Sequence, residues 1–203
     1  LNMKIYTKPA GPMGANTYLL TEDDKTAVAI DCGGEEVWDY ALSKGLKIEY
    51  VLLTHGHFDH IAGCPALAAK GVKIGAAKSE LPLLQSKANL AFEFGAASPE
   101  FPVSFTFEDG DALSLCGMEI SVIATPGHTA GGVCFLSGEN LFTGDTLFFE
   151  SVGRTDFPTG NAAQLVRSIK EKLFTLSGDR RVFPGHEEET TLAHEKQYNP
   201  FIR

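Results

Sequence analysis

The sequence predicts an α/β fold in which two αβ halves pack as a layered sandwich. Short β-rich runs are followed by an amphipathic helix, and the same order occurs again later in the chain. The 203 residues, 43% of them apolar, are enough for one domain with a substantial core. Because no linker, low-complexity stretch or repeat divides the sequence, we expect a single domain over residues 1–203.

The first half is predicted to contain three strands and two helices. The strands are residues 16–20, 26–30 and 50–53, and the helices are residues 35–44 and 61–70. The third strand is a continuous apolar run, which is typical of a strand buried on both faces. Pro65 must lie early in the second helix or bend it. Residues 79–94 have only a partial helical periodicity.

The second half is predicted to be richer in strands. They are residues 103–107, 112–115, 118–124, 133–136, 140–142 and 181–183, and turn signals separate them. Asn161 is expected to cap a helix that continues to residue 176, because Leu165, Ile169 and Leu173 follow at i, i+4 spacing. Residues 191–198 are predicted to form a short terminal helix.

Composition argues against several classes of protein. The net charge is −9 and no basic run occurs, which disfavours nucleic acid as a partner. No apolar run reaches the length of about 18 residues that spans a bilayer, and no secretion signal is visible. We therefore expect a cytoplasmic protein without a membrane partner. Leu1 and Asn2 precede a start at Met3 and are interpreted as residues left from cloning.

The four cysteines, Cys32, Cys64, Cys116 and Cys134, form no C-x-x-C pair. Disulfide scaffolds belong to smaller chains that are denser in cysteine. We therefore expect all four to be reduced and mostly buried. The sequence leaves the oligomeric state open.

The strongest chemical signal is the segment His55-Gly56-His57-Phe58-Asp59-His60, directly after a predicted buried strand. Three imidazoles and a carboxylate within six residues form a dense set of metal ligands. In an extended turn, residues i and i+2 project to the same side, so His55 and His57 can bind one ion. Asp59 and His60 follow where the chain bends into a helix, which can turn them toward a second ion. A polar surface turn is the weaker interpretation.

Three further candidate ligands share one local setting. Each comes directly after a strand end and a glycine, which allows a sharp turn. They are His128 after Gly127, Asp145 after Gly144 and His186 after Gly185. Taken alone, each could be a capping, turn or core residue, but beside the histidine-rich segment they are interpreted as ligands. The sixth histidine, His194, is expected to be a solvated helix residue.

The pattern H-x-H-x-D-H, followed by separated His, Asp and His at strand ends, resembles the metallo-β-lactamase superfamily. The segments GHTAGGVCF, FTGDTLFFESVGRTDFP and FPGHEEETT, with the closing NPF, are similar to short, single-domain members of its glyoxalase II (hydroxyacylglutathione hydrolase) branch. The resemblance covers essentially residues 4–201. It implies a four-layer αββα sandwich, the metallo-β-lactamase fold, with the metal ions at one edge of the β-sandwich.

The resemblance also implies how the ligands are shared between two ions. The first ion would be bound by His55, His57 and His128, and the second by Asp59, His60 and His186, with Asp145 bridging the two. The C-terminal helical domain with which full-length glyoxalase II helps to bind glutathione is not expected here, since 17 residues follow His186. Lactamases of the best-known subclass have Cys in place of Asp145, which argues against antibiotic hydrolysis.

The function implied by the resemblance is hydrolysis of a small acyl thioester by a hydroxide that bridges two metal ions. Asp59 and Asp145 are the predicted catalytic residues, because Asp145 would bridge the ions and Asp59 would orient the nucleophile. Nitrogen and oxygen ligands suit two divalent ions, zinc foremost, with iron or manganese as alternatives. A thiolate whose conjugate acid has a pKa of about 8.5 leaves without a strong general acid.

Two other functions stay open. A persulfide dioxygenase would share the fold, much of the ligand set and a similar G-R-T-D-F segment, but would use a single iron and oxygen. A non-catalytic metal- or ligand-binding module would take up metal without turnover.

Several residues near the motifs have weaker assignments. Arg154 is expected either to bind a substrate carboxylate or to form a structural pair with Asp156. Residues 187–189, three consecutive glutamates that begin with Glu187, are interpreted as a solvated loop. Five phenylalanines are assigned to the core rather than to a substrate-binding wall, namely Phe92, Phe94, Phe101, Phe105 and Phe107.

Overall fold

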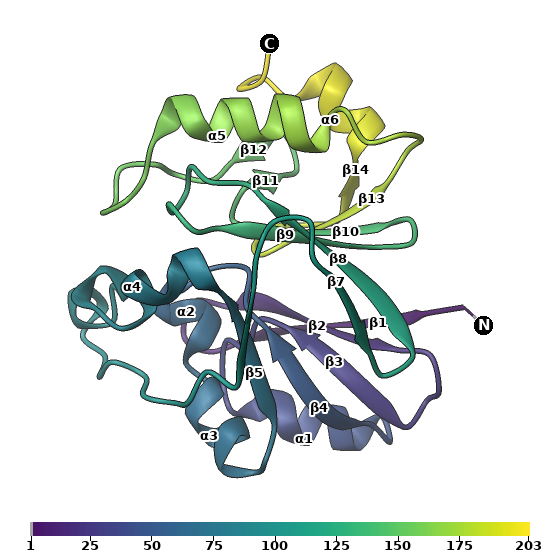
Figure 1. Ribbon diagram of the computed structural model, residues 1–203, viewed down its shortest axis with the longest axis vertical. Helices are drawn as coiled ribbons and strands as arrows, with labels where there is room; N and C mark the ends of the chain where they lie inside the picture. Colours follow the sequence, from purple (N-terminus) through teal and green to yellow (C-terminus); the bar gives the residue numbers. More distant parts are fainter. Residues whose placement is uncertain (1) are drawn as a thin grey trace.

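The computed structural model describes residues 2–203 and contains two six-stranded sheets that face each other (Figure 1). Leu1, one of the two residues assigned to cloning, lies outside the described residues. The first sheet has the order β1 (Lys4–Ala10), β2 (Ala15–Thr21), β3 (Thr26–Ile30), β4 (Lys47–Leu52), β5 (Lys73–Ala77) and β6 (Phe105–Phe107). The second has the order β14 (Thr190–Thr191), β13 (Arg181–Pro184), β10 (Asn140–Gly144), β9 (Val133–Ser137), β8 (Met118–Ala124) and β7 (Ala112–Leu115). A small hairpin, β11 (Leu147–Phe148) and β12 (Ser151–Val152), follows β10.

Both sheets mix parallel and antiparallel pairs. In the first sheet β3, β4, β5 and β6 run parallel, while β1 and β2 are antiparallel to their neighbours. In the second sheet β10 and β13 are the parallel pair. The carboxyl ends of parallel strands meet at one edge of a sheet, so the segments that follow them are brought together there.

Helices cover the outer face of each sheet. The helices are α1 (Glu36–Ser43), α2 (Phe58–Ile61), α3 (Cys64–Ala69), α4 (Leu81–Leu84), α5 (Ala162–Ser168) and α6 (Leu192–Tyr198). Short 3₁₀ turns occur at Lys78–Glu80, Lys87–Asn89 and Phe92–Phe94, and α5 continues as a π-helical turn at Ile169–Leu173. Helices α1 and α3 lie against the first sheet, and α5 and α6 lie against the second (Figure 1).

Three buried clusters separate the four layers. One packs Val37 of α1 and Leu67 of α3 on the first sheet, and another packs Leu165 and Ile169 on the second. Between the sheets lies a third cluster, rich in aromatic rings such as Phe135. The arrangement is the αββα sandwich that the sequence predicts, and the fold class is confirmed.

Single elements depart from the prediction for local reasons. Strand β1 was not predicted, because its lysines and Pro9 give no strand signal, yet an edge strand tolerates proline. The helix predicted over residues 61–70 is divided into α2 and α3, and Pro65 lies in the first turn of α3. Residues 79–94 form short turns rather than one helix.

Other sequence expectations have mixed outcomes. Asn161 caps α5, since its side chain accepts a hydrogen bond from Gln164 N. All four cysteines are free, and three of them are buried. Phe107 is buried as assigned, but Phe92 is 76% exposed and Phe94 is 47% exposed, so their assignment to the core is wrong. Within residues 2–203, no helix combines the length and the apolar character needed to cross a membrane.

Replacing Phe135 by Ala should destabilise the fold strongly. The Phe135 ring is fully buried between the sheets, with its centroid 5.4 Å from that of Phe107. Truncation leaves a cavity, and the free energy of unfolding should fall by about 3–5 kcal/mol. Guanidinium denaturation of the chelated protein measures this loss. The exposed Phe92→Ala control should change it by less than about 0.5 kcal/mol; similar values for both variants would contradict the assigned core.

Candidate metal centre

Strand ends place all seven predicted ligands at one edge of the sandwich. His55 and His57 follow β4, and Asp59 and His60 lie in the single turn of α2. The other three ligands come from the second sheet, where His128 lies between β8 and β9, Asp145 directly after β10, and His186 just after β13. Because β10 and β13 are parallel neighbours, Asp145 and His186 leave the sheet at the same edge.

The two glycines that precede His128 and His186 are needed for close packing. A Cβ on Gly185 would lie 2.3 Å from Asp145 Oδ1 and 2.7 Å from His60 Cε1. Gly127 has φ +150°, and a Cβ there would lie 2.3 Å from Leu165 Cα. Any side chain at either position would push the ligand turn away from its neighbours.

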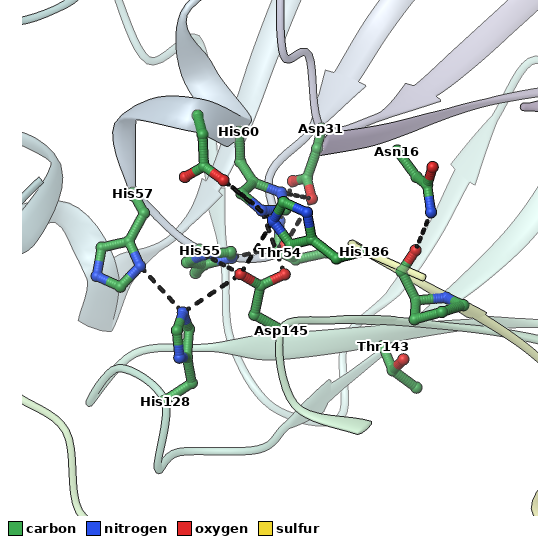
Figure 2. Close-up of polar contacts among 12 residues, drawn as sticks. Asn16, Asp31, Thr54, His55, His57, His60, His128, Thr143, Asp145 and His186 are labelled. Carbon is green, nitrogen blue, oxygen red and sulfur yellow. Dashed lines mark hydrogen bonds and ion pairs between the residues drawn. The ribbon is translucent and has the colours of Figure 1, made fainter. Parts of the chain in front are cut away.

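The ligand atoms form two groups that meet at Asp145 (Figure 2). One group is His55, His57 and His128, and the other is Asp59, His60, Asp145 and His186. Within each group the ligand atoms lie within 4.8 Å of one another. The structure therefore brings together every residue that the sequence predicts as a metal ligand.

Asp145 lies between the two groups. Its Oδ2 is 3.7 Å from His55 Nε2, 3.5 Å from His128 Nε2 and 3.6 Å from His186 Nε2. Its Oδ1 is 3.2 Å from His60 Nε2. A carboxylate in this position can offer one oxygen to each of two cations.

Unpaired polar atoms indicate that the cluster fits metal ions. Among the described residues, Nε2 of His55 and His60 and Oδ1 of Asp145 face the cluster and are buried without a hydrogen-bond partner. Burying such atoms unpaired costs about 1–3 kcal/mol each. Imidazole nitrogens and carboxylate oxygens are donors that zinc, iron and manganese accept. The donor set thus fits divalent metal ions, without deciding which one.

Hydrogen bonds on the far side of three imidazoles, those of His55, His60 and His128, fix their orientation. Asp31 Oδ2 lies 2.8 Å from His60 Nδ1, and Thr54 Oγ1 donates to the same oxygen at 2.7 Å. Thr54 Oγ1 in turn lies 3.0 Å from His55 Nδ1, and His128 Nδ1 lies 2.7 Å from the carbonyl oxygen of Arg154. With Nδ1–H donated outward, each of these rings presents its Nε2 lone pair to the cluster.

Burial and charge set the protonation of the cluster. Burial, together with the nearby His128, lowers the pKa of His57 to about 3, and burial lowers the pKa of His55 well below its usual value. Burial alone would raise the pKa of Asp145, but the nearby charge of His60 holds it well below its ordinary range. Burial also opposes a charge on His60, yet three surrounding carboxylates raise its pKa.

Comparison with known proteins decides the family. The family model of the metallo-beta-lactamase superfamily matches residues 10–186, which include all seven candidate ligands. The chain belongs to the metallo-β-lactamase superfamily. It is thus a member of a metal-dependent hydrolase family, and its superfamily binds divalent metals.

Individual relatives match the chain over nearly its whole length. Hydroxyacylglutathione hydrolase GloC from Haemophilus influenzae is 35% identical, over 98% of this chain and 98% of that protein. The crystal structure of BLEG-1 B3 metallo-beta-lactamase is similar with a TM-score of 0.92 and 32% identity, covering 98% and 99% of the two chains. The crystal structure of TTHA1623 in a di-iron-bound form has a TM-score of 0.85 and 35% identity, covering 97% and 100%.

Two residues of this superfamily member were missed by the sequence analysis. Asp31 comes directly after β3, so the rule that selected the other ligands at strand ends could have found it. Glu80 had no such signal. Its side chain, 2% exposed, accepts hydrogen bonds from Gly56 N at 3.1 Å, Thr129 Oγ1 at 2.6 Å and Gly131 N at 3.2 Å. Glu80 thereby joins the loop after β4 to the loop between β8 and β9.

The structure also shows the surroundings of three features with weaker assignments, namely Arg154, the glutamates at residues 187–189 and His194. Arg154 Nε and Nη2 donate to the two carboxylate oxygens of Asp156, each at 2.6 Å, so the pair with Asp156 is present. A role of Arg154 toward substrate stays a prediction. Residues 187–189 are exposed, as expected of a solvated loop, and Glu189 pairs with Arg181 at 2.7 Å. His194 is half-buried, with its ring stacked on Phe149.

Replacing Asp31 by Asn should weaken metal binding by about 10- to 100-fold. The amide would turn an N–H₂ group toward His60 Nδ1 and Thr54 Oγ1, where two donors now meet one acceptor oxygen. Competition with a chromophoric chelator measures the affinity, and circular dichroism checks the fold. Asp24→Asn, which changes an exposed residue paired with Lys4, is the matched control. Equal affinity of the two variants would argue against the orienting role of Asp31.

Glu80→Gln should remove one component of the pH dependence of stability. Burial raises the pKa of Glu80 from 4.5 to about 7, against the effect of its three hydrogen bonds. The folded state therefore holds a proton that the unfolded chain has lost, and stability falls as pH rises between these values. From about pH 5 to about pH 8, the free energy of unfolding of wild type should fall by about 2–3 kcal/mol more than that of the variant. Denaturation of the chelated proteins tests this; parallel pH profiles would contradict it.

Proposed function

We propose that the protein hydrolyses small acyl thioesters at a binuclear metal centre. The observation that carries the proposal is the pair of ligand groups that meet at the buried carboxylate of Asp145. A single ion at the first group could use Asp145 but would leave Asp59, His60 and His186 without a function. The likeness to hydroxyacylglutathione hydrolase GloC supports a thioester as the substrate.

Each ligand has a proposed role in this centre. His55, His57 and His128 would hold the first ion, Asp59, His60 and His186 the second, and Asp145 would bridge them. The two divalent ions would be zinc foremost, with iron or manganese as alternatives. When bound, they would lower the pKa of a water molecule so that it reacts near neutral pH, and they would act as a Lewis acid on the carbonyl.

The side chains around the cavity would position the reactants. Asp59 lines the cavity, and its Oδ2 lies 3.1 Å from His186 Nε2 and 3.4 Å from His60 Nε2. This carboxylate can accept a hydrogen bond from the attacking water and orient it toward the carbonyl carbon. As the carbon–sulfur bond breaks, the sulfur takes the electron pair and leaves as a thiolate. A thiol pKa of about 8.5 makes a strong general acid unnecessary.

Metal-replete protein should release free thiol from S-D-lactoylglutathione and from S-butanoyl-N-acetylcysteamine, and a chelator should abolish the release. Asp145→Ala removes the carboxylate between the two ligand groups. It should lower kcat/KM by at least about a hundredfold, even in excess metal. A thiol-reactive dye measures the rate, and metal content is determined on the same samples.

The control is Asp24→Ala, which removes an exposed carboxylate far from the ligands in sequence and should keep wild-type turnover. Near-normal turnover of Asp145→Ala with full metal content would refute the scheme. Loss of thiol release from both thioesters, with metals bound, would reject thioester hydrolysis. Oxygen consumption with a glutathione persulfide would then favour a dioxygenase, and metal uptake without turnover a binding module.

Hydrolysis of a β-lactam is a second candidate, favoured by the likeness to BLEG-1 B3 metallo-beta-lactamase. A lactam has to expel an amine, which is a much poorer leaving group than a thiolate. The cavity offers few acids to protonate it, since its charged lining beyond the metal ligands consists of Arg154 and Glu187 among residues 2–203. A chromogenic cephalosporin in the same assay separates the two activities.

A further inference from the structure

One hollow adjoins the candidate metal centre, and a second hollow shares three apolar lining residues with it. The first has a volume of about 440 Å³ and is lined by candidate ligands such as His57 and Asp145. The second has a volume of about 450 Å³ and extends away from the ligands. The residues common to both are Leu90, Phe94 and Phe157, which we name the apolar wall.

The apolar wall begins in contact with a metal ligand and continues outward. The Phe157 ring meets His57 edge-on at 6.1 Å between centroids, and Phe94 meets Phe157 edge-on at 6.4 Å. Phe94 stacks on the buried Phe58 at 5.2 Å, which fixes its position. The outer face of Phe94 is nevertheless 47% exposed. A rigid, water-exposed aromatic surface beside a reactive centre is typical of a binding site for an apolar group.

Beyond the candidate ligands, few charged side chains line the two hollows, and they carry both signs. Of the described residues that line the first hollow, Arg154 alone carries a permanent positive charge. Its Nε and Nη2 donate to Asp156, and its Cζ lies 3.9 Å from the ring centroid of Phe157. Glu187 adds a negative charge to the lining. In the second hollow Lys87 is accompanied by Glu93.

We propose that the acyl group of the substrate is an uncharged alkyl chain or aromatic ring that lies on the apolar wall. This proposal rests on the proposed function and narrows it from acyl thioesters in general to apolar ones. The reaction balances as thioester plus water giving carboxylate plus thiol. When the thioester carbonyl lies at the ligands, an acyl chain extends past Phe157 to Phe94. Each methylene added to the chain is therefore transferred from water onto an apolar surface.

The test compares thioesters of one neutral thiol, N-acetylcysteamine, that differ only in the acyl group. From acetyl through butanoyl to hexanoyl, kcat/KM should rise by about 2- to 4-fold per methylene. Succinyl, which has a carboxylate in place of the terminal methyl group of butanoyl, should react at least about tenfold more slowly than butanoyl. Phe94→Ala and Phe157→Ala should flatten the dependence on chain length. Phe92→Ala, whose exposed ring lies outside both hollows, should preserve it.

The proposal is overturned if wild-type kcat/KM does not rise with chain length, or if succinyl or lactoyl thioesters are preferred. Either result with active enzyme leaves the proposed function intact. If metal-loaded protein turns over no thioester, the proposed function fails. A binding measurement then tests whether the apolar wall binds an apolar group. Calorimetry then compares S-hexyl- and S-methyl-N-acetylcysteamine, which cannot be hydrolysed. If wild type binds the hexyl compound more tightly and Phe94→Ala loses this preference, the proposed role of the apolar wall is supported. Equal binding of the two compounds rejects it.

Discussion

Asp145 buries its carboxylate among four imidazoles, and the rest of the structure depends on balancing that charge. Its two oxygens lie 3.2–3.7 Å from ring nitrogens of His55, His60, His128 and His186. A buried anion is tolerated only where positive charge or donors face it, and metal ions held by these imidazoles would supply that charge. The imidazoles come from both sheets, so the balance exists only once the sheets have packed. Assembly of the sandwich and assembly of the site are thus a single event.

Much of this arrangement could be predicted because it follows from local rules. The segment from His55 to His60 concentrates ligands where a buried strand ends, and the short spacing alone identifies it. His128, Asp145 and His186 are distant in sequence, but each repeats the same strand end, glycine and ligand. Parallel strands that end at one edge then bring them together. The four layers likewise follow from strand runs and amphipathic helices in order.

The parts that could not be predicted depend on partners far away in the chain. Glu80 matters because it meets Thr129 and Gly131, and no residue near it in sequence reveals those contacts. Phe94 looks like a core residue by composition, since hydrophobicity does not tell whether a ring will face another ring or open space. Its exposure results from the irregular turns after β5, where the helical periodicity is broken.

The order of the strands along the chain has a consequence for protein engineering. Strands β1 to β6 form one sheet, all strands of the other sheet come from β7 onward, and the connecting turn at residues 108–111 is exposed. A cut there would give one fragment with His55, His57, Asp59 and His60, and another with His128, Asp145 and His186. Neither fragment contains all the proposed ligands of either ion, so complementation of the two would be driven by metal. The fold is in this sense a natural template for a split metal reporter.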